Sequence, residues 1–150
     1  MALGIIFIFA LSSIAFVFSG FAPQQTNEQL KPLDSFVVEG EIDLRLEAAY
    51  IQGGFTFLKY FYGADADPQI SSFIEQAPES FKTPSGQIQI IVIKIRSSDT
   101  LARIVNANGD VEVRDLTTDK IFDALCSTLT VPPTECVIGG INSSDNSTSQ

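Results

Sequence analysis

The sequence contains few side chains that could carry out covalent chemistry. Its 150 residues include two cysteines and neither histidine nor tryptophan. Without histidine, the chain can form no serine–histidine or cysteine–histidine catalytic pair and no zinc site with imidazole ligands. Two cysteines are also too few for a four-thiolate zinc or iron–sulfur site. We therefore predict no catalytic residue, no metal and no cofactor, and we expect a binding or structural role ahead of an enzymatic one.

The two cysteines, Cys126 and Cys136, lie ten positions apart. A catalytic cysteine pair is usually much closer, with its reactive thiolate at a helix N-terminus. Cys126 instead falls late in an expected helix, where the helix dipole disfavours a thiolate. We predict a structural disulfide that fixes the C-terminal segment to this helix, which the chain-entropy model values at about 2–3 kcal/mol. The alternative is a thiol–disulfide oxidoreductase that uses these two residues.

A second candidate site is the Asp-x-Asp pair of Asp65 and Asp67. An EF-hand loop that began at Asp65 would need glycine at its sixth position and glutamate at its twelfth, where this sequence has Ile70 and Gln76. We interpret Asp67 as the N-cap of a helix that opens at Pro68, and we predict no metal site. The loop is still the expected ligand-facing surface, which comprises Tyr60, Tyr62, Asp65, Asp67 and Pro68.

The charge of the chain limits its partners. The formal net charge is −9 at pH 7, and we find no cluster of basic residues. Because phosphate contacts supply most of the affinity for nucleic acid, we predict no nucleic-acid partner. A local group of acids is expected to form a solvated face rather than a paired acid and base, and it comprises Glu39, Glu41, Asp43 and Glu47.

The N-terminus carries the strongest compartment signal. Residues 1–22 have no ionisable side chain, and residues 2–22 form an apolar run just long enough to span a bilayer as a helix. We predict a signal-anchor transmembrane helix over residues 1–22, with the lipid bilayer as partner of residues 2–22. The alternative is a secreted protein from which residues 1–19 are cleaved as a signal peptide.

The signals for the orientation of the predicted single-pass membrane protein conflict. Lys31 follows the apolar run and favours the cytoplasmic side, whereas the cysteine pair and the tail favour the outside. We expect an extracytoplasmic domain. The predicted organisation is a polar tether over 23–35, a folded domain over 36–138 and a disordered Ser/Asn-rich tail over 139–150. The tail contains two glycosylation sequons, at Asn142 and Asn146.

Hydrophobic patterning predicts an α/β domain. Segment 41–52 fits either a strand or a helix by its apolar spacing, and its Glu/Leu/Arg/Ala content favours a helix. Helices are also predicted from Asp67-Pro68, with an exit bracketed by Pro78 and Pro84, and over 119–129, with Thr117 or Thr118 as the cap. The Asn108-Gly109 pair predicts a hairpin turn. Strands are predicted at 36–38, 55–62, 87–95, 101–105 and 111–116.

This order of elements resembles the thioredoxin-like fold. The likeness covers residues 36–130: an aromatic strand at 55–62, a helix opened by Asp67-Pro68, a buried strand at 87–95, and a hairpin at Asn108-Gly109-Asp110 that leads through Leu116-Thr117 into the last helix. It implies a mixed β-sheet flanked by helices. The predicted fold class is therefore a thioredoxin-like α/β sheet preceded by one N-terminal transmembrane helix.

The sequence also departs from this family. The redox Cys-x-x-Cys of the family would fall in residues 63–68, which read Gly-Ala-Asp-Ala-Asp-Pro. The family's proline before the strand at Leu101 is absent from residues 97–100. The link between strands 87–95 and 101–105 is also too short for the family's usual helix, and it could instead join an antiparallel pair. The resemblance therefore implies a degenerate member without thiol–disulfide chemistry.

Three functions follow from these observations. The first is a membrane-tethered extracytoplasmic module that binds a protein partner or assists assembly at the cell envelope without catalysis. The second is a structural subunit similar to a type IV pilin, because an uncharged N-terminal helix precedes a β-rich head. The third and least expected is the oxidoreductase that would use Cys126 and Cys136.

Overall fold

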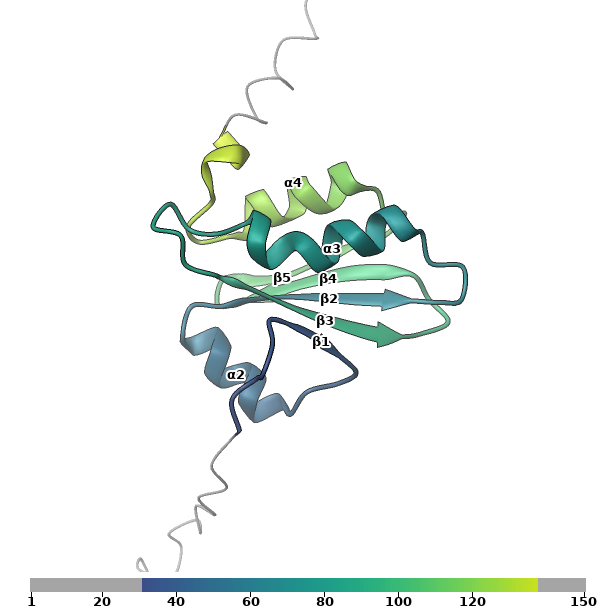
Figure 1. The fold of residues 1–150 in the computed structure, drawn as a ribbon, viewed down its shortest axis with the longest axis horizontal. Coiled ribbons are helices and arrows are strands. Elements are labelled where there is room, and N and C mark those ends of the chain that lie inside the picture. Colours follow the sequence, from purple (N-terminus) through teal and green to yellow (C-terminus); the bar gives the residue numbers. More distant parts are fainter. Residues whose placement is uncertain (1–30, 138–150) are drawn as a thin grey trace, which may run out of the picture. The chain divides into compact units, whose positions relative to one another are not determined.

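A computed structural model describes residues 31–137, which form an α/β unit around one mixed sheet of five strands in the order β1-β3-β2-β4-β5. Helices α3 and α4 lie on one face of this sheet and α2 lies on the other (Figure 1). The elements in chain order are β1 (Val37–Glu39), α2 (Leu44–Gln52), β2 (Thr56–Tyr62), α3 (Pro68–Ser80), β3 (Ile90–Arg96), β4 (Leu101–Asn106), β5 (Gly109–Val113) and α4 (Thr118–Thr128).

The strand β2 lies at the centre of the sheet, parallel to β3 and antiparallel to β4. The short link from β3 to β4 passes the end of β2, where the backbone N–H of Ser97 donates to the carbonyl of Tyr62 at 3.0 Å. Strands β3 and β4 therefore do not pair with each other, and the alternative antiparallel pair is not formed. The C-terminal ends of β2 and β3 consequently meet at one edge of the sheet, which the helix α3 also approaches with its N-terminus.

Alternating side chains of the strands supply two apolar layers. Leu58, Tyr60 and Val92 point to the face covered by α3 and α4, and all three are fully buried. Phe57 and Ile91 point to the opposite face, which packs against α2. Because β2 and β3 are apolar on both faces, they can occupy the covered centre of the sheet.

The helices α2, α3 and α4 each begin at a side chain that caps them. Asp43 Oδ1 accepts from the backbone N–H of Arg45 at 2.7 Å, and Asp67 Oδ1 accepts from that of Gln69 at the same distance. Thr117 caps α4 in the same way. These caps satisfy N–H groups that a helix leaves without partners, and they confirm the predicted N-cap role of Asp67.

Several predicted boundaries differ from the structure. The helix predicted from residue 41 begins at Leu44, and the strand predicted from residue 87 begins at Ile90. Pro78 lies inside α3 rather than after it. The hairpin turn consists of residues 107–108 instead of 108–109, because the Asn106 side chain accepts from the Asn108 N–H at 2.8 Å and closes the turn one position earlier.

The predicted fold class needs correction. Its α/β part agrees with the five-stranded mixed sheet, but its transmembrane helix is not found: within residues 31–137, no helix has the length and apolarity to cross a membrane. Residues 1–22, most of the predicted tether and the predicted tail with Asn142 and Asn146 lie outside the described residues.

Candidate functional site

A polar hollow of about 530 Å³ lies at the edge of the sheet where β2 and β3 end and α3 begins. We call it the β2–β3 hollow. Strand β2 contributes an aromatic ring, the following loop contributes small residues, and β3 contributes two cations. Its lining consists of Tyr62, Gly63, Ala64, Ala66, Ser71, Lys94, Arg96 and Ser97.

Lys94 is the more buried of the two cations, with 14% of its side chain exposed. Its ammonium donates to Glu75 on α3 at 2.6 Å and lies 3.4 Å from Glu39 on β1. The hydrogen bond to Glu75 raises the pKa of Lys94 above its ordinary value. Lys94 therefore stays positively charged, and its charge is largely neutralised by its two partners.

Arg96 is two positions further along β3 and shares the face of Lys94, because alternate residues of a strand point the same way. Its side chain is exposed, and within residues 31–137 it forms no ion pair. Its guanidinium thus has all its donors available to a ligand or to water.

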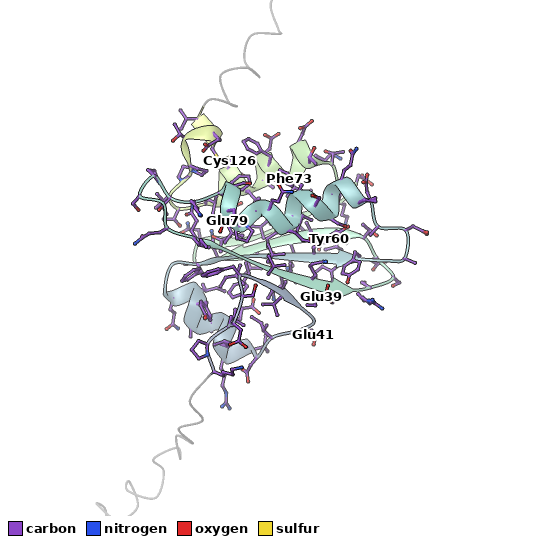
Figure 2. The ribbon with its side chains drawn as sticks, in the orientation of Figure 1. Glu39, Glu41, Tyr60, Phe73, Glu79 and Cys126 are labelled. Atoms are coloured by element: carbon purple, nitrogen blue, oxygen red, sulfur yellow. A yellow bond between two sulfur atoms is a disulfide. The ribbon has the colours of Figure 1, made fainter. Side chains whose placement is uncertain are left out.

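Two tyrosines of β2 support the hollow. Tyr60 is fully buried beneath α3 (Figure 2), with its hydroxyl 3.5 Å from the Ser71 hydroxyl. The ring of Tyr62 stacks on that of Tyr60, with centroids 5.3 Å apart, and the Lys94 ammonium lies 5.5 Å from the Tyr62 centroid. Tyr62 therefore presents a fixed aromatic surface beside the cations.

Of the predicted ligand-facing residues, only one lines the β2–β3 hollow. Tyr62 lines the hollow, whereas Tyr60 lies beneath it in the core. Asp65, Asp67 and Pro68 are exposed but do not line it, since Ala64 and Ala66 supply the loop's contribution. Asp67 is engaged as the N-cap of α3, so the Asp-x-Asp pair lies at the rim of this hollow rather than inside it.

The cysteines lie at the other end of the sheet. Cys126 and Cys136 form a disulfide, with their Cα atoms 5.3 Å apart, which confirms the predicted disulfide. Cys126 falls in the last turn of α4, far from the N-terminus of that helix. Figure 2 shows it at the end of α4 opposite the end of β2 that leads into the loop after Tyr62. The thiols are therefore separate from the β2–β3 hollow.

A second hollow, of about 590 Å³, lies at the opposite edge of the sheet. Its apolar rim includes Phe36, Phe55 and Val131. Its buried polar side chain, Gln89, donates to the carbonyls of Phe81 and Val131 at 2.9 and 2.8 Å. Because this amide already holds the C-terminal segment in place, we assign it a structural role.

The acids around β1 and α2 were expected to form one solvated face, and they do not. Glu39 and Glu41 are exposed, and Asp43 is a helix cap. Glu47, however, is buried and forms an ion pair of 2.7 Å with Lys59 between α2 and the sheet. The pair joins α2 to the strand β2.

The sequence-based prediction missed Lys94 and Arg96 as site residues. Both lie at the C-terminal end of the apolar strand β3, in register with Tyr60 and Tyr62 on β2. The same spacing of two polar side chains at the end of each strand could have predicted the site, because neighbouring parallel strands place such residues on one face of the sheet. The signal requires knowledge that β2 and β3 are neighbours, which the sequence did not supply. No family model and no curated protein matches this chain, so the site is assigned from its geometry alone.

Proposed function

We propose that this chain is a non-catalytic protein-binding domain that holds its partner at the β2–β3 hollow. The observation that carries the proposal is the combination of a stacked aromatic ring, Tyr62, with Arg96, an arginine that forms no ion pair within residues 31–137, at the exposed edge of the sheet. Tyrosine and arginine are enriched among the residues that dominate protein–protein affinity, because both combine a large contact surface with hydrogen-bond donors.

The composition of the hollow supports binding over catalysis. Its lining residues include no cysteine, no histidine and no carboxylate. The hydroxyls of Ser71 and Ser97 have no general base among the other lining residues, so they lack the usual means of activation. The remaining chemistry of this surface is hydrogen bonding, charge pairing and aromatic contact.

The disulfide supports a location outside the cytoplasm, since such bonds persist in oxidising compartments. Its position at a helix C-terminus, remote from the hollow, favours the structural role over the oxidoreductase alternative. The pilin-like alternative depends on residues 1–22, which lie outside the described residues, and it stays a prediction.

The central position of β2, followed at its C-terminal end by the loop of residues 63–67, supports the resemblance to thioredoxin-like domains. If the relationship holds, the chain keeps the scaffold and has lost the thiols from residues 63–68. We therefore regard the hollow as a binding surface on a scaffold whose redox chemistry is missing.

Site-specific photo-crosslinking in the cells that make this protein tests the proposal. A photoreactive amino acid replaces Ala64, which is exposed on the wall of the hollow. The matched control replaces Asp123, which is exposed on α4. We expect position 64 to give one recurring protein adduct that position 123 does not give. Identical adducts from both positions, or no protein adduct from position 64, would contradict the proposal.

A further inference from the structure

We propose that the β2–β3 hollow recognises a carboxylate of the partner polypeptide, which pairs with the guanidinium of Arg96 while the neighbouring partner residue packs on Tyr62. This inference rests on the proposed function and names the chemistry of the bound group. Its basis is the charge distribution around the hollow.

The hollow is lined by two cations in an acidic chain. The formal net charge is −9, yet two of the residues that line the hollow are cations and none is an acid. All nine lysines and arginines lie in residues 31–137. Among the arginines, Arg103 and Arg114 form ion pairs, whereas Arg45 and Arg96 form none within this part of the chain. Arg96 is the one that lines the hollow.

The geometry favours a planar anion with a single charge. A guanidinium presents parallel N–H donors that match the two oxygens of a carboxylate. The N-terminus of the helix α3 approaches the same edge, but the carboxylate of Asp67 already caps it, so Arg96 is the group that attracts the anion. Ser71 also lines the hollow, with its hydroxyl 3.5 Å from that of Tyr60.

Four neighbouring acids oppose a more highly charged group. Glu75 and Glu39 already neutralise Lys94, and Asp65 and Asp67 are exposed in the loop beside the hollow. Arg96 is the lining cation that forms no ion pair within residues 31–137. A phosphate carries close to two negative charges at neutral pH and would be repelled by these carboxylates. A carboxylate carries one, which Arg96 matches.

The aromatic surface gives the second part of the contact. The ring of Tyr62 is held by its stack on Tyr60, and the loop beside it ends in small side chains at Ala64 and Ala66. The space above the ring can therefore accept the side chain or backbone that adjoins the partner's carboxylate. Such a contact excludes water from the charge pair and strengthens it.

Binding of the full-length chain to arrays of random hexapeptides tests this inference. Each peptide is made in four matched forms: amidated with a central glutamine, amidated with a central glutamate, amidated with a central phosphoserine, and glutamine-containing with a free C-terminal carboxylate. The glutamate form tests a side-chain carboxylate, and the form with a free C-terminus tests a main-chain carboxylate at the end of the partner. The random neighbours ensure that the outcome does not depend on one flanking sequence.

We expect at least one carboxylate form to bind about tenfold more tightly than its neutral match. Arg96→Gln should remove this preference, and the matched control Arg45→Gln should keep it. Arg45 is also an exposed arginine, on α2, and both variants change the net charge equally. Two results would overturn the inference: phosphoserine peptides that bind more tightly than glutamate peptides, or a carboxylate preference that is absent or that survives in Arg96→Gln.

The two proposals can fail separately. If the peptides show no carboxylate preference while a photoreactive residue at position 64 still captures a partner, only the carboxylate inference is wrong. If position 64 captures no partner and the peptides also fail, the proposed function is wrong as well.

Discussion

At the scale of single residues, the ion pairs are of two kinds, buried and exposed, and Arg96 belongs to neither. Glu47 and Lys59 are the inward pair, with 10% and 20% of their side chains exposed. The exposed pairs, such as Arg114 with Glu112, lie on the surface of the sheet. Arg96 has neither kind of partner within residues 31–137, which is why it is the residue assigned to binding.

The Glu47–Lys59 pair gives a stability prediction. Glu47→Ala should lower the free energy of unfolding by about 3 kcal/mol, because it leaves the Lys59 ammonium without its partner in a largely buried position. The double variant Glu47→Leu/Lys59→Met should recover most of this loss. Urea denaturation measures both, with Arg114→Ala as a surface control that should cost about 1 kcal/mol or less. Equal losses in Glu47→Ala and Arg114→Ala would show that the pair does not hold α2.

A pH dependence follows from Asp110, which accepts hydrogen bonds from Arg103 Nε at 2.8 and 2.7 Å. The hydrogen bonds from Arg103 lower the pKa of Asp110 below 3.8. The pair therefore stabilises the folded chain fully above that pH, and the contribution is lost as the pH falls through the lowered pKa. The difference in unfolding free energy between wild type and Asp110→Asn should be constant at neutral pH and shrink in acid. A difference that grows in acid would contradict this assignment.

At the scale of elements, the N-terminal end of the helix α3 borders the hollow. The contribution of its N-cap, Asp67, to stability can be tested by mutation. Asp67→Ala should destabilise the chain by about 1 kcal/mol, because the N–H of Gln69 loses its acceptor. Asp65→Ala is the matched control, since the Asp65 side chain makes no hydrogen bond within the described residues, and it should change stability by less than about 0.5 kcal/mol. Equal effects in thermal unfolding would mean that the two aspartates act together, as a ligand site would require.

The helix α4 and its disulfide give a further prediction. Replacement of Cys126 and Cys136 by serine should cost about 2–3 kcal/mol of stability. It should leave the crosslink from position 64 unchanged, because the disulfide lies at the opposite end of the sheet. An insulin-reduction assay should be blank for wild type and variant alike. Insulin reduction by the wild type that the variant loses would instead support the oxidoreductase.

Local elements could be predicted from the sequence because their signals are local. The Asp67-Pro68 start of α3 and the aromatic strand before it were both predicted within one or two residues. The hairpin was predicted one position late, because the Asn106 side chain, which the pattern did not single out, closes the turn. Burial of Glu47 was missed for a related reason, since its partner Lys59 lies on another element.

At the scale of the whole molecule, the site depended on an arrangement that residue patterns leave open. A four-residue link between β3 and β4 is compatible with direct pairing of these strands, and only the insertion of β2 between them brings Tyr62 beside Lys94 and Arg96. The loop at residues 63–68 was predicted to face a ligand, and its residues Gly63, Ala64 and Ala66 line the hollow. The cations that give this hollow its charge come from β3 and required the strand order.

Arg96 and the surrounding hollow are the part of the molecule that we propose holds a protein partner. The most direct test is the yield of the position-64 crosslink in two charge-reversal backgrounds, Arg96→Glu and Arg45→Glu, which alter the net charge of the chain equally. We expect Arg96→Glu to reduce the adduct about tenfold or more, because it places a carboxylate where the partner's anion binds, and Arg45→Glu to leave the yield unchanged. Equal adduct yields in the wild type and both variants would contradict it.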